Sequence, residues 1–400
     1  MRTADRNEPD MRVVDFSTHL SGPMASHLLA ETGVDVIKVE HPVIGDGNRG
    51  MSPKIAGVGD FHVGLNSGVR SIAASTRSEN WPQLVESCAR WADAVIVGSR
   101  PADARKRGLD FASLAKHNDR LVYTAISGYG LSGPWEQFTA HGQNVDALAG
   151  QVPVEEVDGR LVTGSGWRSS GTTLAGVFAA LGTLAAVQRR DEVGRPQFVH
   201  VSLWHSAMWW KWRDINDLAN LGHAWPDYRD LGPRYALYKT LDDRAILVCP
   251  LEEKFWNRFA TLLELDEDAA SRGSWTRENS GMDYGYEGEY EMITARIRTR
   301  TRSHWEAELE RLEIPFAPVL DVAEAMNSEH AGANDLLRTT VVNGESARVV
   351  ASPVQLHLDA DGKTAGPFGP LSSPPEIGEQ SADILNELGL GHLDPDAVRS

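Results

Sequence analysis

The chain has 400 residues, of which 41% are hydrophobic and 24% are charged, and its formal net charge is −17 at pH 7. This length predicts two domains. The negative charge argues against a general nucleic-acid surface, and no apolar run approaches the roughly 20 residues that a membrane-spanning helix needs, so we expect neither nucleic acid nor membrane as a partner.

The termini and the cysteines point to a reducing compartment. Residues 1–10 are polar, lack the apolar stretch of a signal peptide and are interpreted as a disordered extension. The two cysteines, Cys88 and Cys249, give no disulfide framework. We therefore expect a cytoplasmic protein.

The first half of the chain alternates strand and helix patterns. A strand at Arg12–Phe16, a Ser-Gly-Pro turn at Ser21–Pro23, a helix at Met24–Glu31 and a strand at Asp35–Val39 form a βαβ unit. Such units imply a parallel sheet. The alternation continues with helices at 81–91, 111–117 and 172–190 and strands at 94–97, 121–126 and 198–201. The predicted fold is therefore α/β, with a large Rossmann-like domain at 11–205 together with 335–400.

The composition changes after about residue 206. Five tryptophans fall within 22 residues, namely Trp204, Trp209, Trp210, Trp212 and Trp225. They fit a buried helix contact and a domain or subunit interface equally well, and we interpret 206–224 as a linker or interface helix. Residues 225–334 predict a smaller α+β domain, with strands at 235–238 and 245–248 and helices at 253–263 and 290–312. Strand patterns return at 341, followed by a coil at 366–375 and a helix at 383–388.

A glycine-rich loop follows the predicted strand 121–126. Gly128 to Gly133 matches GxGxxG, the pattern of dinucleotide-binding loops, but Pro134 and Trp135 follow with no helical period. A dinucleotide site needs a helix that opens at the loop and offers its amides to the pyrophosphate. The motif is therefore a weak signal for a nicotinamide cofactor.

The order of motifs along the chain resembles the family III CoA-transferases, the group of formyl-CoA transferase, carnitine CoA-transferase and 2-methylacyl-CoA racemase. The resemblance rests on the opening βαβ unit, the loop Ser127–Pro134, the segment Ser170–Gly176 with Gly194–Gln197, and two late motifs at 314–319 and 375–380. It spans nearly the whole chain. It implies binding of CoA or acyl-CoA, no metal, a carboxylic acid as second substrate, and an interlocked dimer.

The resemblance also implies which residues contact CoA. Lys106 falls where the family places a basic residue near the CoA pyrophosphate, within a cluster that includes Arg100; the alternative for this cluster is a solvated helix face. His41 stands where formyl-CoA transferases have an arginine, and Arg70 is adjacent to a position where a lysine is common. Gly130 of the glycine loop completes the predicted CoA-binding set.

Thr172 stands at the position where the family usually holds its catalytic aspartate. In the transferases that carboxylate attacks the thioester and forms a mixed anhydride. A threonine hydroxyl needs a base and could form only an ordinary ester. We therefore interpret Thr172 as the N-cap of the following helix. Asp146 and Glu155 are weak candidates for a substitute carboxylate.

His141 and Glu252 resemble the acid/base pair of the racemases. In that branch a glutamate orients the histidine, which exchanges a proton at one face of the α-carbon. His141 fits a structural histidine equally well. His200 and His205 stand five residues apart, a poor spacing for a metal pair, and are interpreted as structural.

Three versions of the function follow. The chain transfers CoA between carboxylic acids with Thr172 in place of the aspartate, as a homodimer. Alternatively, it is a non-catalytic subunit paired with an aspartate-bearing paralogue. In the third version it is an acyl-CoA isomerase, racemase or lyase that uses His141 and Glu252. A CoA-sensing protein without turnover is a further, non-enzymatic hypothesis.

Overall fold

The computed structural model describes residues 11–223, 231–271, 284–286, 288–354 and 372–400. The chain forms two compact units. The first consists of residues 1–212 and 335–400, and the second of residues 213–334. The linker expected at 206–224 corresponds to parts of the helices α9 (Leu203–Trp210) and α10 (Trp212–Leu221).

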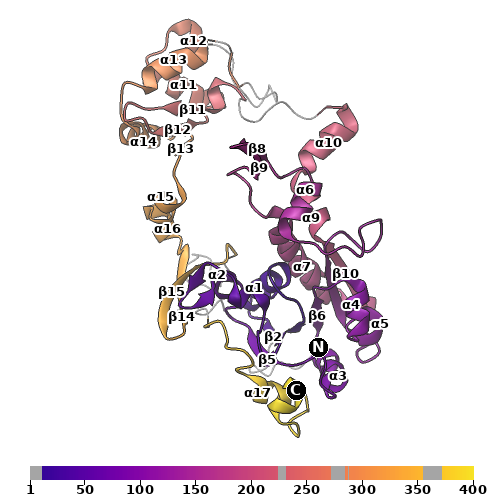
Figure 1. Ribbon diagram of the computed structural model, residues 1–400. Coiled ribbons are helices and arrows are strands. Elements are labelled where there is room, and N and C mark those ends of the chain that lie inside the picture. The colour runs from indigo at the N-terminus through magenta and orange to yellow at the C-terminus, as the bar shows by residue number, and fades with distance from the viewer. Residues whose placement is uncertain (1–10, 224–230, 272–283, 287, 355–371) are drawn as a thin grey trace. The chain divides into compact units, whose positions relative to one another are not determined.

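The first unit is built around a six-stranded sheet in which every neighbouring pair is parallel. The strand order is β10-β7-β6-β1-β2-β5, and the edge strand β10 lies beside α7 (Figure 1). The strands are β1 (Arg12–Asp15), β2 (Asp35–Glu40), β5 (Arg70–Ala73), β6 (Ala94–Val97), β7 (Val122–Ser127) and β10 (Gln197–Ser202). This architecture confirms the predicted α/β fold with a parallel sheet.

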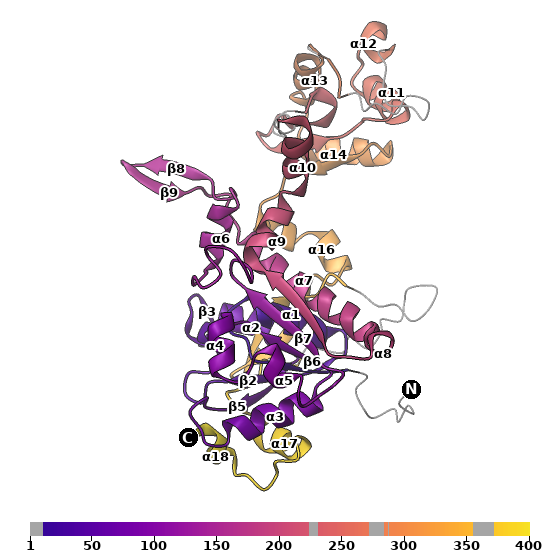
Figure 2. The same ribbon diagram turned by 90° about the vertical axis from the view of Figure 1, so that its right-hand side faces the viewer.

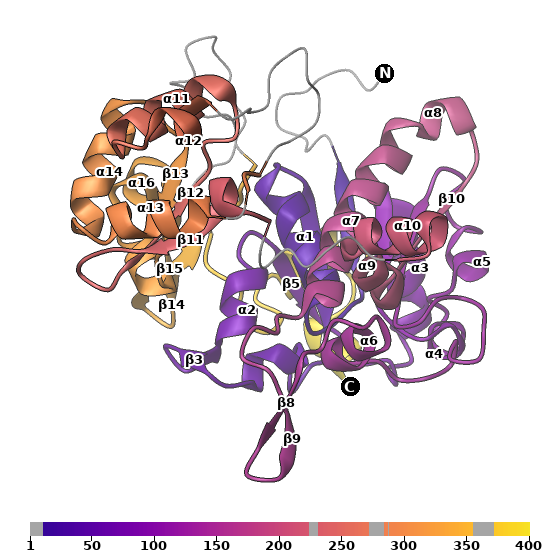
Figure 3. The ribbon, with the colours of Figure 1, turned by 90° about the horizontal axis from the view of Figure 1, so that it is seen from above.

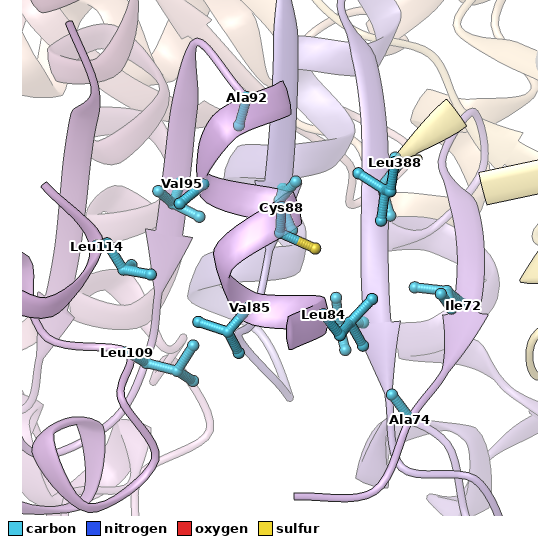
Figure 4. Packing of buried hydrophobic residues seen from close by; sticks show 14 of the residues in the cluster. Ile72, Ala74, Leu84, Val85, Cys88, Ala92, Val95, Leu109, Leu114 and Leu388 are labelled. Carbon is cyan, nitrogen blue, oxygen red and sulfur yellow. The ribbon is translucent and has the colours of Figure 1, made fainter. Parts of the chain in front are cut away.

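Helices cover both faces of this sheet, because alternate strand residues point to opposite sides. On one face Val14 and Val95 pack against Leu84 and Cys88 of α3 (Trp81–Trp91). Figure 4 shows Val95, Leu84 and Cys88 of this cluster. On the other face, Val13, Val36 and Ile96 pack against α1 (Ser21–Glu31) and α7 (Ser170–Gln188). These two helices run side by side (Figure 3), and Gly176 allows α7 to approach Met24 closely.

Short helices complete the sheet connections, and two small ribbons are attached to the first unit. The hairpin β8 (Val154–Val157) and β9 (Arg160–Thr163) turns at Asp158-Gly159, both with positive φ, and stands away from the sheet (Figure 2). The ribbon β14 (Leu337–Val342) and β15 (Glu345–Val350) packs on α2 (Asp60–Leu65). The remaining elements are η1 (Gly47–Gly50), β3 (Lys54–Ile55), β4 (Val58–Gly59), α4 (Pro101–Lys106), α5 (Phe111–Leu114), α6 (Gly142–Leu148), α8 (Arg190–Val193), α17 (Ser381–Glu387) and α18 (Pro395–Arg399).

The second unit has its own core. Its sheet is antiparallel in the order β11-β12-β13, and Trp256 and Phe259 pack there with Ile293. The helix expected at 290–312 is two helices, because the chain leaves the helical path between Ile297 and Arg302. The elements are η2 (Pro233–Tyr235), β11 (Ala236–Lys239), β12 (Ala245–Val248), α11 (Glu253–Leu262), α12 (Glu267–Ser271), α13 (Glu289–Ile297), α14 (Arg302–Arg311), β13 (Phe316–Pro318), α15 (Val322–Met326) and α16 (Glu329–Ala333).

From the sequence we expect no apolar run of membrane-spanning length, but within the described residues α7 is one helix that is long and apolar enough to cross a membrane, by length and composition alone. Core helices of soluble proteins meet the same two criteria. Ala175, Ala179 and Thr183 of α7 are fully buried against the rest of the unit. This packing favours a core helix.

Candidate functional site

Ligands of parallel α/β sheets bind at the carboxyl ends of the strands, where the strand order reverses. Here the order reverses between β1 and β6, since the chain leaves β1 toward β2 and leaves β6 toward β7 on the other side. The two loops that follow these strands meet, because a Cβ on Gly98 would stand 2.8 Å from the Cβ of Ser17. The loops after β1 and β6 therefore form the candidate site.

The first turn of α7 lies at this edge. Ser21, the first residue of α1 after the β1 loop, donates a hydrogen bond from its hydroxyl to the Thr172 carbonyl at 2.9 Å. Gly142, the first residue of α6, is equally close: a Cβ there would stand 2.2 Å from Ser169 Oγ and 3.3 Å from Thr172 Oγ1. Thr172 thus lies where the beginnings of α1, α6 and α7 converge.

Thr172 is not the N-cap, which corrects the sequence interpretation. The cap position is Ser169, and Thr172 is the third residue of the helix. The reason is a cap from a distant part of the chain: the buried carboxylate of Asp146 accepts a hydrogen bond from the Gly171 N–H at 2.9 Å and from the Trp167 indole at 3.1 Å. An oxygen acceptor satisfies a first-turn amide whichever residue supplies it. The helix therefore begins earlier than its local sequence indicates.

The Thr172 side chain is buried, at 7% exposure, and its hydroxyl is already engaged. Oγ1 donates to the Ser169 carbonyl at 3.2 Å and lies 2.5 Å from Ser169 Oγ. No described base lies within hydrogen-bond distance of it, whereas a hydroxyl nucleophile requires one. The backbone N–H of Thr172 donates to no described acceptor. The residue can thus donate hydrogen bonds to a developing negative charge far better than it can attack a carbonyl.

His141 immediately precedes α6 and is exposed, and its ring forms no hydrogen bond with the described residues. Its neighbour Gly142 contacts Thr172, so the structure brings these two predicted residues to one place. Glu252 belongs to the second unit and is half-buried. It occupies the N-cap position of α11, but its side chain forms no capping hydrogen bond. The acid/base pairing of His141 with Glu252 stays a prediction.

Four of the predicted CoA contacts belong to loops or a helix that follow the carboxyl ends of strands. His41 follows β2, and its Nδ1 accepts from the Val43 amide at 3.2 Å. Arg100 follows β6, pairs with Asp103 at 2.7 Å and reaches the Gln137 carbonyl at 3.4 Å. Gly130 follows β7 with φ +111° and donates to Ser127 Oγ. Lys106 ends α4, is exposed and pairs with no described acid.

Arg70 differs from these four. It begins β5, at the amino ends of the strands, and forms two ion pairs, with Asp35 and with Glu387, each at 2.7 Å. Burial lowers the pKa of Arg70, but the two carboxylates outweigh that effect and raise it. This placement makes Arg70 a tie between β2, β5 and α17, and argues against a contact with CoA.

A buried charge network lies beneath the β1 and β2 loops. Lys38 is 1% exposed, and its ammonium lies 2.9 Å from Asp46 and 3.3 Å from Asp15. Burial lowers the pKa of Lys38, but the two carboxylates more than offset this and raise it, so the lysine is charged. Glu40 accepts a two-pronged contact from Arg49, which keeps the pKa of Glu40 low despite burial. The network fixes the loops that form the candidate site.

Two site features escaped the sequence interpretation. His19 lies in the β1 loop with a φ of +72°; the sequence signal available was its place between strand and turn. The second is a contact between β10 and the end of β7, in which His200 Nε2 lies 2.9 Å from Ser127 Oγ. Burial and the neighbouring His205 lower the pKa of His200. His200 and His205 line a cavity of about 210 Å³ with Phe178 and Trp209. Among the described residues, no three His, Cys, Asp or Glu side chains are grouped to hold a metal.

The chain is similar over most of its length to known proteins in both sequence and fold. The family model of CoA-transferase family III matches residues 9–380. The chain is 27% identical to cinnamoyl-CoA:phenyllactate CoA-transferase of Clostridium sporogenes, over 95% of this chain and 92% of that protein. It is 22% identical to the alpha subunit of succinyl-CoA--L-malate CoA-transferase of Chloroflexus aurantiacus, over 94% and 88%. Its fold is similar to that of a CAIB/BAIF family protein from Brucella suis, with a TM-score of 0.73, 22% identity and coverage of 95% and 98%.

Proposed function

The chain belongs to CoA-transferase family III, and from this membership we propose that it binds an acyl-CoA thioester and moves CoA from one carboxylic acid to another. The similarity to a cinnamoyl-CoA:phenyllactate CoA-transferase supports the reaction class. The observation that carries the proposal is the position of Thr172 in the first turn of α7, beside Ser21 and Gly142 at the carboxyl edge of the parallel sheet.

We propose that Thr172 replaces the aspartate that the family uses, and that no acyl group is carried on this residue. Instead, the carboxylate of the acceptor acid attacks the thioester carbonyl, the C–S bond breaks, and CoA leaves as a thiolate. The thiolate then attacks the acceptor's carbonyl carbon in the mixed anhydride and releases the first acid. Each bond that forms is matched by one that breaks, without an enzyme-bound intermediate. The backbone N–H of Thr172 is suited to stabilise the tetrahedral oxyanions.

Arg100 and Lys106 are proposed to hold the phosphates of CoA. Both are exposed cations on the segment that follows β6, on one side of the point where the strand order reverses. Exposed basic side chains gain most from a doubly charged phosphate. His41 follows β2 and Gly130 follows β7, at the same carboxyl edge of the sheet. We place the protein in the cytoplasm, where CoA thioesters are substrates.

The test is a mass spectrum of the acyl-CoA pool after the purified chain has been incubated with one acyl-CoA and a panel of carboxylic acids. The proposal expects a new acyl-CoA whose acyl group comes from an added acid. It also expects no CoA or acyl adduct on the intact protein mass when the reaction is quenched during turnover. An adduct on the wild-type chain would contradict direct attack by the acceptor, and absence of any new thioester would contradict transfer by this chain alone.

The second candidate arrangement is a heteromer, favoured by the similarity to a protein named as an alpha subunit. Val177, Leu181 and Leu184 form an exposed apolar row on α7, with exposed fractions between 39% and 60%. Trp209 and Trp210 of α9 are each more than half exposed. Such a row supports association. We propose that it contacts a second copy or an aspartate-bearing paralogue. Light scattering after size exclusion separates monomer from dimer, and co-purification with a paralogue, together with transfer only in its presence, would select the heteromer.

A second candidate reaction is proton exchange at the α-carbon of an acyl-CoA. It is favoured by the exposed imidazole of His141, whose neighbour Gly142 contacts Thr172. Incubation of an acyl-CoA with the protein in deuterium oxide would introduce deuterium at the α-carbon, and His141→Ala would abolish the incorporation. If the wild-type chain incorporates none, this reaction is excluded.

A further inference from the structure

The loop between β1 and α1 is fixed at every second residue. Ser17 donates from its N–H and its hydroxyl to Asp15 Oδ1, and its carbonyl accepts from Lys38 at 3.2 Å. His19 donates its N–H to Asp46 at 2.9 Å, and its carbonyl accepts from the Asn48 side chain at 2.8 Å. Ser21 is bound to the Thr172 carbonyl. The loop therefore has a single defined path next to Thr172.

The residues that hold His19 are themselves immobile. Asp46 and Asn48 are 1% and 0% exposed. Asp46 is paired with the buried Lys38, and Asn48 Oδ1 accepts from His62 Nδ1 at 3.1 Å. Packed groups of this kind can impose an unfavourable conformation on a neighbour.

His19 has such a conformation. Its φ of +72° lies in the left-handed region, which glycine and asparagine adopt most readily and which costs other residues about 1–2 kcal/mol. The contacts that impose it are made by backbone atoms of His19, so a glycine would receive the same hydrogen bonds without strain. Fold stability alone does not account for a histidine here.

The imidazole of His19 is directed by local contacts and remains exposed. Its Nδ1 lies 2.8 Å from the Thr18 hydroxyl. Its Nε2 forms no hydrogen bond with the residues that the structure describes. A Cβ on Gly47 would come within 3.0 Å of that nitrogen, so the glycine leaves it accessible. A polar group is thus held at the β1 side of the reversal point, two residues from the contact with Thr172.

We propose that His19 contacts the substrate, and that its Nε2 donates a hydrogen bond to the carbonyl oxygen of the bound acyl thioester. The inference rests on the proposed binding of acyl-CoA and adds a residue to it. A donor on this oxygen polarises the carbonyl and stabilises the oxyanion that forms on attack. Free CoA has no acyl carbonyl, so His19 would distinguish acyl-CoA from CoA.

The test compares two ligands on matched variants by calorimetry. His19→Asn keeps a residue that tolerates the left-handed region but removes the imidazole, and His19→Gly removes both side chain and strain. Loss of one hydrogen bond predicts that acetyl-CoA binds about fivefold more weakly to both variants, whereas the affinity for free CoA stays within about twofold. His392→Asn, at an exposed histidine of the C-terminal segment, should bind both ligands as the wild type does.

Chemical modification provides a readout that does not depend on a variant. Diethyl pyrocarbonate should modify His19 in the free protein, and saturating acetyl-CoA should slow that modification while leaving His392 unaffected. Equal weakening of CoA and acetyl-CoA, unchanged affinities, or unprotected His19 would each overturn the inference. If the wild-type protein binds neither CoA nor acetyl-CoA, the proposed function fails first, and the two failures are thereby distinguished.

Discussion

A Cβ at position 142 would stand 3.3 Å from both Oγ1 and Cγ2 of Thr172, so only a glycine lets the start of α6 approach the first turn of α7 this closely. The same Cβ would lie 2.2 Å from Ser169 Oγ. The segment that carries His141 is thereby held against the segment that carries Thr172.

Gly142→Ala should therefore impair function more than folding. The added methyl group must displace Ser169 and the start of α6, an overpacking that costs about 1–3 kcal/mol. Transfer activity and the melting temperature check this. Gly166→Ala is the matched control, because a Cβ there meets nothing within 4 Å. Equal behaviour of the two variants would contradict the close contact.

Asp146→Ala should destabilise the protein by about 3 kcal/mol, since it leaves two donors, the Gly171 amide and the Trp167 indole, without a charged acceptor. Denaturant unfolding measures the change. Hydrogen exchange should also rise at the first turn of α7 specifically. Glu155→Ala, on the exposed strand β8, should stay within about 0.5 kcal/mol of the wild type. Unaltered exchange in α7 would show that Asp146 is not its cap.

Thr172→Asp should raise CoA transfer by about tenfold or more and should yield a CoA adduct on the intact protein, because a carboxylate can form the anhydride and thioester that a hydroxyl cannot. The first turn of a helix also favours a negative charge. Thr173→Asp, one residue further along α7 and exposed, should do neither. A transfer rate unchanged from the wild type, with no adduct, would mean that the surroundings of residue 172 differ from those of a transferase.

Acid should destabilise the protein first through His62. The side chain is buried, donates from Nδ1 to Asn48 and leaves Nε2 without a partner among the described groups. Burial, reinforced by Arg49, lowers the pKa of His62 from 6.5 to about 4. The unfolded chain gains a proton below pH 6.5 and the folded chain only below about 4. Stability present above pH 6.5 is therefore lost as the pH falls through this window, by at most about 3 kcal/mol.

Unfolding free energies between pH 7 and pH 4 check this expectation. His62→Gln should flatten the pH dependence, whereas His392→Gln should retain it. The lowered pKa values of Glu40 and Asp46 act at lower pH, because their ordinary values are 4.5 and 3.8. If the unfolding free energy of His62→Gln falls with pH as steeply as that of the wild type, another group causes the loss of stability.

The second unit should depend on one buried ion pair. Arg234 and Glu289 are both fully buried, meet at 2.5 and 2.9 Å, and the guanidinium lies 3.8 Å from the Trp256 ring centroid. Glu289→Gln should destabilise the unit by about 3–5 kcal/mol, because it removes the charge opposite a buried guanidinium. Glu308→Gln, which breaks an exposed pair with Arg311, should cause no measurable change. Equal unfolding free energies of the Glu289→Gln and Glu308→Gln variants would contradict this expectation.

The sequence was sufficient for the parallel sheet, because strand and helix patterns alternate along the first half of the chain. It failed at the start of α7, since the cap comes from Asp146, 25 residues away from Gly171. The sequence also did not reveal that Arg70 lies at the amino end of β5 and pairs with Asp35 and Glu387, because position in a motif does not show which end of a strand a side chain occupies. His19 was missed because histidine carries no local signal for a left-handed φ, which the buried Asp46 and Asn48 impose from outside the loop.

The C-terminal segment has a consequence for how the protein is made. Gln380 exchanges hydrogen bonds with Ser71 on the edge strand β5, the amide of Ser75 donates to Val398, and Ile384, Leu385 and Leu388 belong to the core beneath the sheet. All six strands are synthesised before the second unit, and the segment that covers β5 is synthesised after it. The nascent chain therefore has an open, apolar sheet edge throughout synthesis of the second unit, and open edges of this kind promote aggregation. Translation speed and chaperone supply should consequently govern the soluble yield of this protein more strongly than the final stability of its fold.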